Sequence, residues 1–176
     1  MTKREFISHS ESDTRKLGRK LGENIESGIC VLLSGDLGAG KTVLVRGVGE
    51  ALGITGVRSP SFTLINEYEM IPYLTSPNLG EESKEGYAPK VEGACVKNDV
   101  RNMLIVHADL YRLDDASSLG LEEYEDSVLF VEWPDRWRNP PVNNVLRVSI
   151  SAVSESEREI EICAYGEKAE RVLAKL

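Results

Sequence analysis

Residues 35–42 combine glycines, a lysine and a threonine at a spacing that suits phosphate binding. The run reads Gly35-Asp36-Leu37-Gly38-Ala39-Gly40-Lys41-Thr42 and satisfies the pattern G-x-x-x-x-G-K-[ST]. Glycines let backbone N–H groups approach phosphate oxygens with no Cβ in the way. Lys41 would reach the β- and γ-phosphates, and the Thr42 hydroxyl would ligate a bridging Mg²⁺. A plain glycine turn needs neither side chain, so the run predicts a nucleoside triphosphate site with Mg²⁺, in which Lys41 is also a catalytic candidate.

Two carboxylates follow apolar runs and are candidates for the same site. Glu132 comes directly after the apolar run at 128–131, and Asp109 follows the run at 104–108. A P-loop site needs a carboxylate at the end of a neighbouring strand to hold the metal and its water. We expect one carboxylate to support Mg²⁺ and the other to orient or deprotonate the attacking water, so both are catalytic and metal-binding candidates. The alternative for either is a loop cap or an ion pair with Arg112.

Four further features flank these residues in the sequence. Trp133 could stack on an adenine or simply pack, and His107 is expected to be a packed, hydrogen-bonded neighbour of Asp109. The run Ser59-Pro60-Ser61-Phe62-Thr63 is either a switch-like segment that senses the γ-phosphate or a simple turn. Arg46 is expected to face solvent or a partner rather than to act in catalysis.

The spacing of apolar residues predicts the elements that carry these side chains. A helix from residue 10 to about 28 precedes a buried strand at 29–33, and a second helix over 44–52 follows the glycine loop. Further strands are expected at 62–68, 103–108, 128–131, 145–153 and 158–163, the last two as a hairpin, and a terminal helix at 167–176. This order predicts an α/β fold with a three-layer P-loop NTPase-like sheet flanked by helices, and a C-terminal β-hairpin and helix.

Length and composition predict one folded domain. The chain has 176 residues, of which 41% are hydrophobic and 28% charged, so it can bury a core and matches the size of one domain. We therefore predict a single P-loop ATPase domain over 1–176. Prolines and glycines interrupt any regular periodicity at about 70–102, which reads as a long surface insertion without recognisable chemistry.

Charge and cysteine content restrict the partners and the compartment. The net charge is −8, and residues 109–135 contain nine acids and one base. This balance disfavours unaided nucleic-acid binding and favours either a partner with a basic face or a solvated acidic surface. The three cysteines lack C-x-x-C spacing, and no apolar run approaches the ~20 residues that cross a bilayer. We expect a cytoplasmic protein without membrane contact.

The sequence favours ATP as the nucleotide. The N-K-x-D and D-x-x-G segments by which GTPases bind guanine and switch are both absent from the chain. Two alternatives to an ATPase remain. One is a small nucleoside or nucleotide kinase, for which the run Asp135-Arg136-Trp137-Arg138 could form part of an acceptor site, and the other is a module that binds ATP without hydrolysing it.

Several motifs taken together resemble the TsaE family. They are the glycine loop at 35–42, Arg46-Gly47, Ser59-Pro60-Ser61-Phe62-Thr63-Leu64, His107-Ala108-Asp109-Leu110-Tyr111-Arg112-Leu113 and Glu132-Trp133-Pro134. The resemblance implies the ATPase of bacterial tRNA threonylcarbamoyladenosine (t6A) synthesis, which modifies the adenosine beside the anticodon. It implies that the ATPase acts with TsaD and TsaB, contacts tRNA only through that complex, resets the complex between turnovers, and is weak alone.

The resemblance also assigns roles to residues. Lys41 and Thr42 would bind phosphate and Mg²⁺, Glu132 would support the metal, and Asp109 would be the catalytic carboxylate. Two departures from the family pattern stand out. Ser61 occupies a position where the family usually has threonine, which keeps the hydroxyl, and 38 residues separate Tyr68 from His107, a longer connection than is usual.

Overall fold

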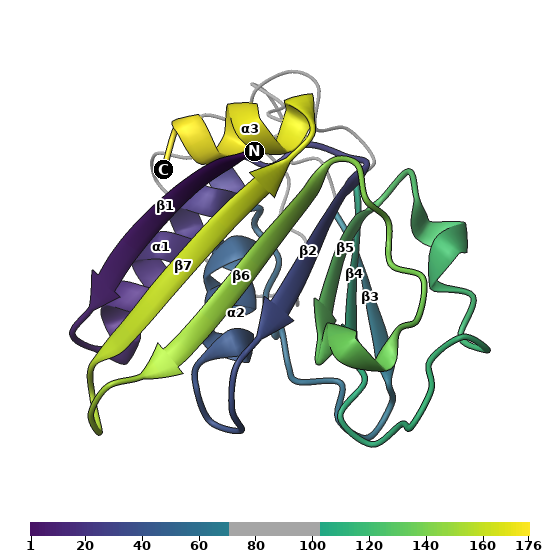
Figure 1. Ribbon diagram of the computed structural model, residues 1–176, viewed down its shortest axis with the longest axis horizontal. Coiled ribbons are helices and arrows are strands. Elements are labelled where there is room, and N and C mark those ends of the chain that lie inside the picture. Colours follow the sequence, from purple (N-terminus) through teal and green to yellow (C-terminus); the bar gives the residue numbers. More distant parts are fainter. Residues whose placement is uncertain (71–102) are drawn as a thin grey trace, which may run out of the picture.

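Seven strands form one mixed sheet in the computed structural model, which describes residues 1–70 and 103–176 (Figure 1). The strands are β1 (Thr2–Ser8), β2 (Ile29–Ser34), β3 (Ile65–Glu69), β4 (Leu104–Asp109), β5 (Val128–Glu132), β6 (Val145–Ala152) and β7 (Arg158–Tyr165). Their spatial order is β1-β7-β6-β2-β5-β4-β3. The four central strands, β6, β2, β5 and β4, are parallel, whereas β3, β7 and β1 pair antiparallel with their neighbours. The central strands therefore all end at the same edge of the sheet.

Three helices cover one face of this sheet. They are α1 (Glu11–Asn24), α2 (Lys41–Ala51) and α3 (Glu167–Ala174), and Figure 1 shows α1 and α2 behind the strands. Ser10 caps α1, because its hydroxyl accepts a hydrogen bond from the Asp13 amide at 3.2 Å. Apolar side chains of all three helices pack on β2, β5, β6 and β7 to form the larger core, as the periodicity of the sequence predicts.

Helices α1 and α2 pack at very short range through glycines. An added Cβ at Gly18 would lie 2.1 Å from the Leu44 carbonyl oxygen, and one at Gly47 would lie 2.2 Å from the Arg15 carbonyl oxygen. No larger residue fits at either position without separating the helices. The close packing brings the side chains that flank the two glycines onto neighbouring ridges.

The other face of the sheet is covered by the chain between residues 110 and 143. This segment contains two short 3-10 helices, η1 (Leu121–Tyr124) and η2 (Pro134–Arg136), and it buries Leu121 and Trp137 against β2, β4 and β5. Two outer layers on one sheet confirm the predicted three-layer α/β class, with turns and short helices as the second outer layer. The predicted C-terminal hairpin and helix are confirmed as β6, β7 and α3.

The structure differs from the prediction at two strands. Strand β1 was not predicted because it is an edge strand whose residues are mostly exposed and polar, and it pairs with β7. Strand β3 begins at Ile65 rather than at Phe62, because the preceding residues form a turn. In that turn the Leu64 amide donates to the Pro60 carbonyl at 2.6 Å, and Leu64 has a φ of 66°.

The predicted insertion at about 70–102 lies outside the described residues, apart from its first residue, Met70. The Met70 amide donates to the Met103 carbonyl at 3.2 Å, and this bond extends the antiparallel pair of β3 and β4 by one step. Within the described ranges, none of the helices has the length and apolar character needed to span a bilayer.

Candidate nucleotide-binding site

The glycine loop connects the end of β2 to the start of α2, at the edge where the parallel strands end. All three of its glycines have a positive φ, with Gly38 at 79°, and Gly35 and Gly40 show the constraint most clearly. Gly35 has a φ of 142°, and a Cβ there would lie 2.3 Å from the Ile150 carbonyl oxygen of β6. Gly40, the residue before the helix, has a φ of 113°. Because L side chains rarely adopt these angles, the loop depends on glycine at both positions.

Lys41 folds back over the loop that precedes it. Its ammonium donates to the carbonyl oxygens of Gly35 at 2.7 Å and of Asp36 at 2.9 Å, and the residue is 4% exposed. Burial lowers the pKa of Lys41, and the negative charges of Glu132, Asp109 and Asp36 oppose this shift. The structure thus places a cation inside the loop, where the sequence pattern expects the phosphates.

Glu132 joins the loop to the neighbouring strand. Its position in β5 lies opposite Leu33 of β2, and its Oε1 accepts a hydrogen bond from the Thr42 hydroxyl at 2.8 Å. The Nε2 of His107 lies 3.0 Å from the same oxygen. The other ring nitrogen of His107, Nδ1, is buried without a hydrogen-bond partner among the described residues. His107 is therefore the packed neighbour that we expected, but it contacts Glu132 rather than Asp109.

Asp109 ends β4 and lies directly opposite Glu132 in the register. Its Oδ2 accepts hydrogen bonds from the hydroxyls of Ser61 at 2.6 Å and Ser59 at 3.3 Å, and its Oδ1 accepts one from the Tyr111 amide at 3.1 Å. Asp109 thus caps the following turn, as its alternative interpretation expects. It also holds the turn at 59–63, a contact that the sequence did not indicate.

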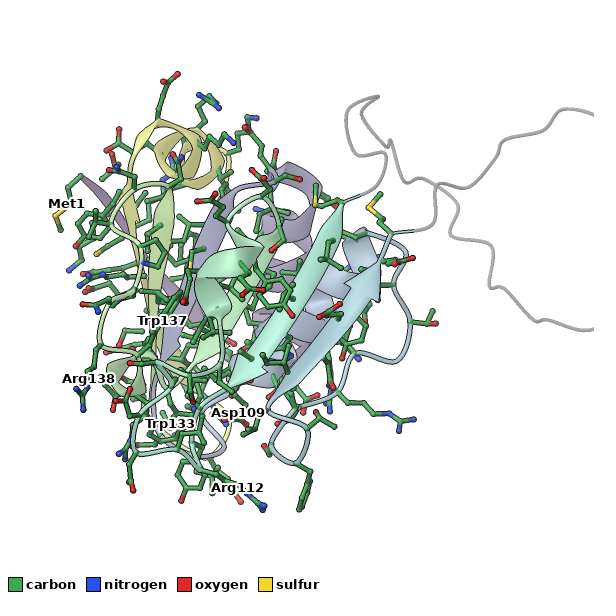
Figure 2. The ribbon with its side chains drawn as sticks, turned by 90° about the vertical axis from the view of Figure 1, so that its right-hand side faces the viewer. Met1, Asp109, Arg112, Trp133, Trp137 and Arg138 are labelled. Atoms are coloured by element: carbon green, nitrogen blue, oxygen red, sulfur yellow. The ribbon has the colours of Figure 1, made fainter. Side chains whose placement is uncertain are left out.

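Arg112 pairs with neither candidate carboxylate. Its guanidinium lies 4.4 Å from the centroid of the Phe62 ring, and Phe62 is 86% exposed. Figure 2 shows Asp109, Arg112 and Trp133 at the same end of the molecule, with Trp137 further along the sheet. The alternative interpretation, in which Arg112 forms an ion pair with Glu132 or Asp109, is therefore not confirmed.

Trp133 follows Glu132 and takes a strained backbone conformation. Its φ is 60°, a left-handed value that costs a bulky residue about 1–3 kcal/mol. The conformation brings its ring to 4.3 Å from the Lys41 ammonium and to 5.0 Å from the Tyr111 ring. Such strain is typical of functional sites, and here it puts an aromatic face beside the loop.

Arg158, the first residue of β7, contacts the loop at the same edge of the sheet, and nothing in the sequence pointed to it. Its Nε donates to the Ala39 carbonyl at 3.0 Å. Its Nη1 donates to three carbonyls of the turn between β6 and β7, those of Ser154, Glu155 and Glu157. This guanidinium therefore ties the glycine loop to a turn that is more than 110 residues away in sequence.

The structure brings together all the side chains that the sequence singled out as catalytic or metal-binding. Lys41 and Thr42 begin α2, whereas Asp109 and Glu132 end β4 and β5. The Thr42 hydroxyl contacts Glu132, and the Trp133 ring lies beside Lys41. In residues 1–70 and 103–176, no group of three or more His, Cys, Asp or Glu side chains can hold a metal. Magnesium in a P-loop site uses one or two protein oxygens together with phosphate oxygens and water, and the Thr42 hydroxyl and Glu132 carboxylate fit that donor set.

Comparisons with known proteins agree on one family. The family model described as "Threonylcarbamoyl adenosine biosynthesis protein TsaE" matches residues 8–76 and 96–160. The tRNA threonylcarbamoyladenosine biosynthesis protein TsaE of Nostoc sp. is 35% identical over 169 residues, which cover 91% of this chain and 85% of that protein. The tRNA threonylcarbamoyladenosine biosynthesis protein TsaE of Bacillus subtilis is 31% identical over 168 residues, which cover 93% of this chain and 87% of that protein. The crystal structure of Bacillus subtilis YdiB superposes with a TM-score of 0.68 at 25% identity, covering 99% of this chain and 93% of that one.

Proposed function

We propose that this chain, which belongs to the TsaE family, is a cytoplasmic Mg²⁺-dependent ATPase that acts with TsaB and TsaD. Its reaction would serve the threonylcarbamoylation of the tRNA adenosine beside the anticodon, by resetting the complex between turnovers. The names of its relatives support the pathway. The geometry around the glycine loop supports the hydrolysis of a nucleoside triphosphate.

The glycine loop and Lys41 bind the triphosphate in this proposal. The Lys41 ammonium now rests on two neutral carbonyl oxygens, 2.7 and 2.9 Å away. Phosphate oxygens carry full negative charge and form stronger charge-assisted hydrogen bonds, so they displace the carbonyls as partners of the ammonium. The Trp133 ring beside this ammonium supplies an aromatic wall to the nucleotide pocket.

Thr42 and Glu132 hold the metal, with Asp109 as a further candidate ligand. Bound Mg²⁺ supplies neutralisation of the charge that develops on the β- and γ-phosphate oxygens. The hydrogen bond between the Thr42 hydroxyl and Glu132 Oε1 shows that the two oxygens already face one space. His107 contacts the same carboxylate oxygen and fixes the orientation of Glu132.

Asp109 orients and deprotonates the attacking water. It lies beside Glu132 in the register and is 4% exposed, so its carboxylate belongs to the site rather than to the solvent-exposed surface. Hydroxyls of Ser59 and Ser61 hold one of its oxygens. Because these serines belong to an exposed turn, a shift of the turn changes the position of the carboxylate. The observation that carries the proposal is a set of three hydrogen bonds. The Thr42 hydroxyl donates to Glu132, and the hydroxyls of Ser59 and Ser61 donate to Asp109.

Release of phosphate from Mg·ATP tests the proposal. The chain is assayed alone and with TsaB and TsaD from the same source, and the Lys41→Ala protein serves as the blank. We expect slow release by the chain alone and strong stimulation by the pair. Indifference to the pair combined with stimulation by a nucleoside acceptor would instead show a kinase, and ATP binding without any phosphate release would show a non-enzymatic module.

A further inference from the structure

A hollow of about 600 Å³ lies away from the glycine loop, between α1, α2 and the loop at 53–58. Four arginines line it: Arg15 and Arg19 from α1, Arg46 from α2 and Arg58 from the loop. The short glycine contact between the two helices explains how arginines from both reach one hollow. The mechanism proposed above uses none of these residues.

The hollow is positively charged in an acidic protein. Glu50 is the only acid that lines it, so the charged residues of its lining carry a net charge of +3. The whole chain carries −8, which leaves −11 for all other residues. Like charges held together in one place repel each other, and an acidic chain has no need of this cluster for solubility. The cluster is therefore better explained by an anionic ligand than by the stability of the fold.

Two of the arginines are held in place with most of their donors unused. The Arg15 Nε pairs with Glu50 at 2.8 Å, and the Arg46 Nε donates to the Val57 carbonyl at 3.3 Å. Both contacts use Nε, and the terminal nitrogens of these two guanidinium groups donate no hydrogen bond to the described residues. The guanidinium groups of Arg19 and Arg58 make no ion pair or hydrogen bond with the described residues. Pre-positioned guanidinium groups with unused donors suit bidentate contacts to anions.

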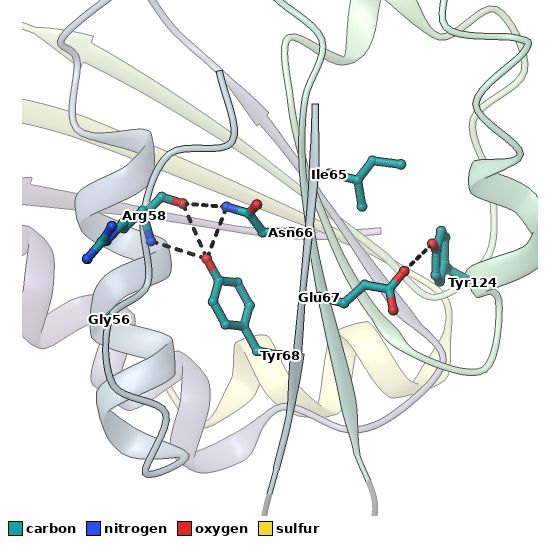
Figure 3. A pocket seen from close by; sticks show the side chains of 7 residues that line it. All are labelled: Gly56, Arg58, Ile65, Asn66, Glu67, Tyr68 and Tyr124. Atoms are coloured by element: carbon teal, nitrogen blue, oxygen red, sulfur yellow. Dashed lines mark hydrogen bonds between the residues drawn. The ribbon is translucent and has the colours of Figure 1, made fainter. Parts of the chain in front are cut away.

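Arg58 is held by its main chain and not by its side chain. A second pocket, of about 500 Å³, lies on the β3 side of the loop, and there the Arg58 amide donates to the Tyr68 hydroxyl at 3.2 Å. The Arg58 carbonyl accepts a hydrogen bond from the Asn66 side-chain nitrogen Nδ2 at 3.4 Å. Figure 3 shows the Arg58 side chain extending away from Asn66 and Tyr68. The loop is thus fixed to the edge strand, and Arg58 lines both this second pocket and the hollow between α1 and α2.

We propose that the hollow between α1, α2 and the loop at 53–58, called the arginine hollow from here on, is a docking site for an acidic segment of a protein partner. This inference rests on the proposed function, in which the chain works within a complex. A protein segment fits better than RNA, because the −11 carried by the rest of the chain repels a long polyanion but not a short acidic segment that enters the hollow. The lining also includes Ile54 and Val57, and apolar side chains beside arginine are typical of protein interfaces.

The hollow is linked to the nucleotide site by chain connectivity. Arg58 directly precedes Ser59, and the hydroxyls of Ser59 and Ser61 donate to Asp109. A segment that pairs with Arg58 therefore pulls on the turn that holds the proposed catalytic carboxylate. Docking at the hollow can in this way change the rate of ATP hydrolysis, although the docked segment does not contact the nucleotide site.

Charge reversals on α1 and the loop test the docking site. The variants Arg19→Glu and Arg58→Glu are compared with Lys20→Glu, a matched control on the same exposed part of α1 whose side chain does not line the hollow. Affinity for the purified TsaB–TsaD pair is measured by interferometry at low and high salt. We expect Arg19→Glu and Arg58→Glu to bind at least about tenfold more weakly at low salt and the control to stay within about twofold. Equal affinity of all three would overturn the proposal.

A second probe separates this proposal from the proposed function. If the wild-type chain does not bind the pair, the assigned partnership fails, and a ten-residue glutamate peptide then tests the hollow itself by NMR titration. Binding that Arg19→Glu weakens and Lys20→Glu preserves supports the hollow, and absence of binding overturns it. An RNA stem-loop that binds more tightly than the peptide with the same arginine dependence also overturns it, in favour of an RNA site. Basal phosphate release by Arg19→Glu and Lys20→Glu at the wild-type rate confirms that both variants are folded.

Discussion

Replacing Arg158 by alanine is expected to weaken nucleotide binding without impairing the chemical step. The substitution removes the hydrogen bond from the guanidinium to the Ala39 carbonyl, and with it the link between the glycine loop and the turn after β6. Among the described residues, no other hydrogen bond joins this turn to the glycine loop, and the remaining three bonds of Arg158 stay within the turn itself. The loop then has to be ordered by the nucleotide when it binds.

The size of the effect follows from the kind of bond that is lost. A hydrogen bond from a charged donor contributes about 1.5–3 kcal/mol, and partial exposure to solvent places this one near the low end. A loss of about 1.4 kcal/mol in the binding free energy corresponds to a tenfold rise in Kd. We expect a Kd for ATP about tenfold higher and a turnover at saturating ATP within about twofold of wild type, because Lys41, Asp109 and Glu132 are untouched.

Isothermal titration with ATP and phosphate release under saturation measure the two quantities. Arg147→Ala is the matched control: Arg147 lies in the neighbouring strand β6, and its guanidinium lies 5.2 Å from the Tyr165 ring centroid. It makes no contact with the glycine loop, so its Kd should not change. A Kd for Arg158→Ala equal to that of Arg147→Ala would refute the positioning role, as would a loss of turnover as large as the loss of affinity.

Four further outcomes are expected. Lys41→Ala should abolish tight ATP binding in a titration, because it removes the buried cation of the loop, and unchanged affinity would exclude the site. Asp109→Asn and Glu132→Gln should reduce turnover more than ATP affinity, and turnover equal to wild type would contradict their roles. Gly18→Ala should lower the free energy of unfolding in urea by about 1–3 kcal/mol, because its Cβ would clash with the Leu44 carbonyl of α2, and an unchanged midpoint would argue against the close packing. Burial raises the pKa of Cys30 to about 12 from 9.0, so this thiol should lower the stability of the protein as the pH rises from about 9 toward 12, with no effect below pH 9; Cys30→Ala should reduce this decline in urea unfolding.

The sequence predicts the centre of the fold better than its edges. Strands β2 and β5 are buried along almost their whole length, so each is a continuous apolar run that can be located from residue types alone. Strand β1 alternates too weakly for that, since Phe6 and Ser8 are its only residues that are not exposed. Its position depends on pairing with β7, a tertiary contact that no local pattern contains.

The candidate site divides in the same way. The glycine loop, Glu132 and Asp109 were identifiable because each follows a recognisable strand, and parallel strands bring such residues to one edge. The contacts of Ser61 with Asp109 and of Arg158 with Ala39 could not be predicted, because each joins segments far apart in the chain. The order of residues sets which groups reach the edge, while packing decides which of them touch.

The bond between Met70 and Met103 also has a use in protein engineering. Because these two residues pair across neighbouring strands, the chain leaves β3 and enters β4 at adjacent points. Both points lie at the start of β4, whereas Asp109 lies at its end. A tight two-residue connection could close a hairpin there in place of residues 71–102, and the register that pairs Tyr68 with Ile105 would be kept. The same junction could accept a fluorescent reporter whose own termini lie close together, since the entropy of closing a longer loop grows only slowly with its length.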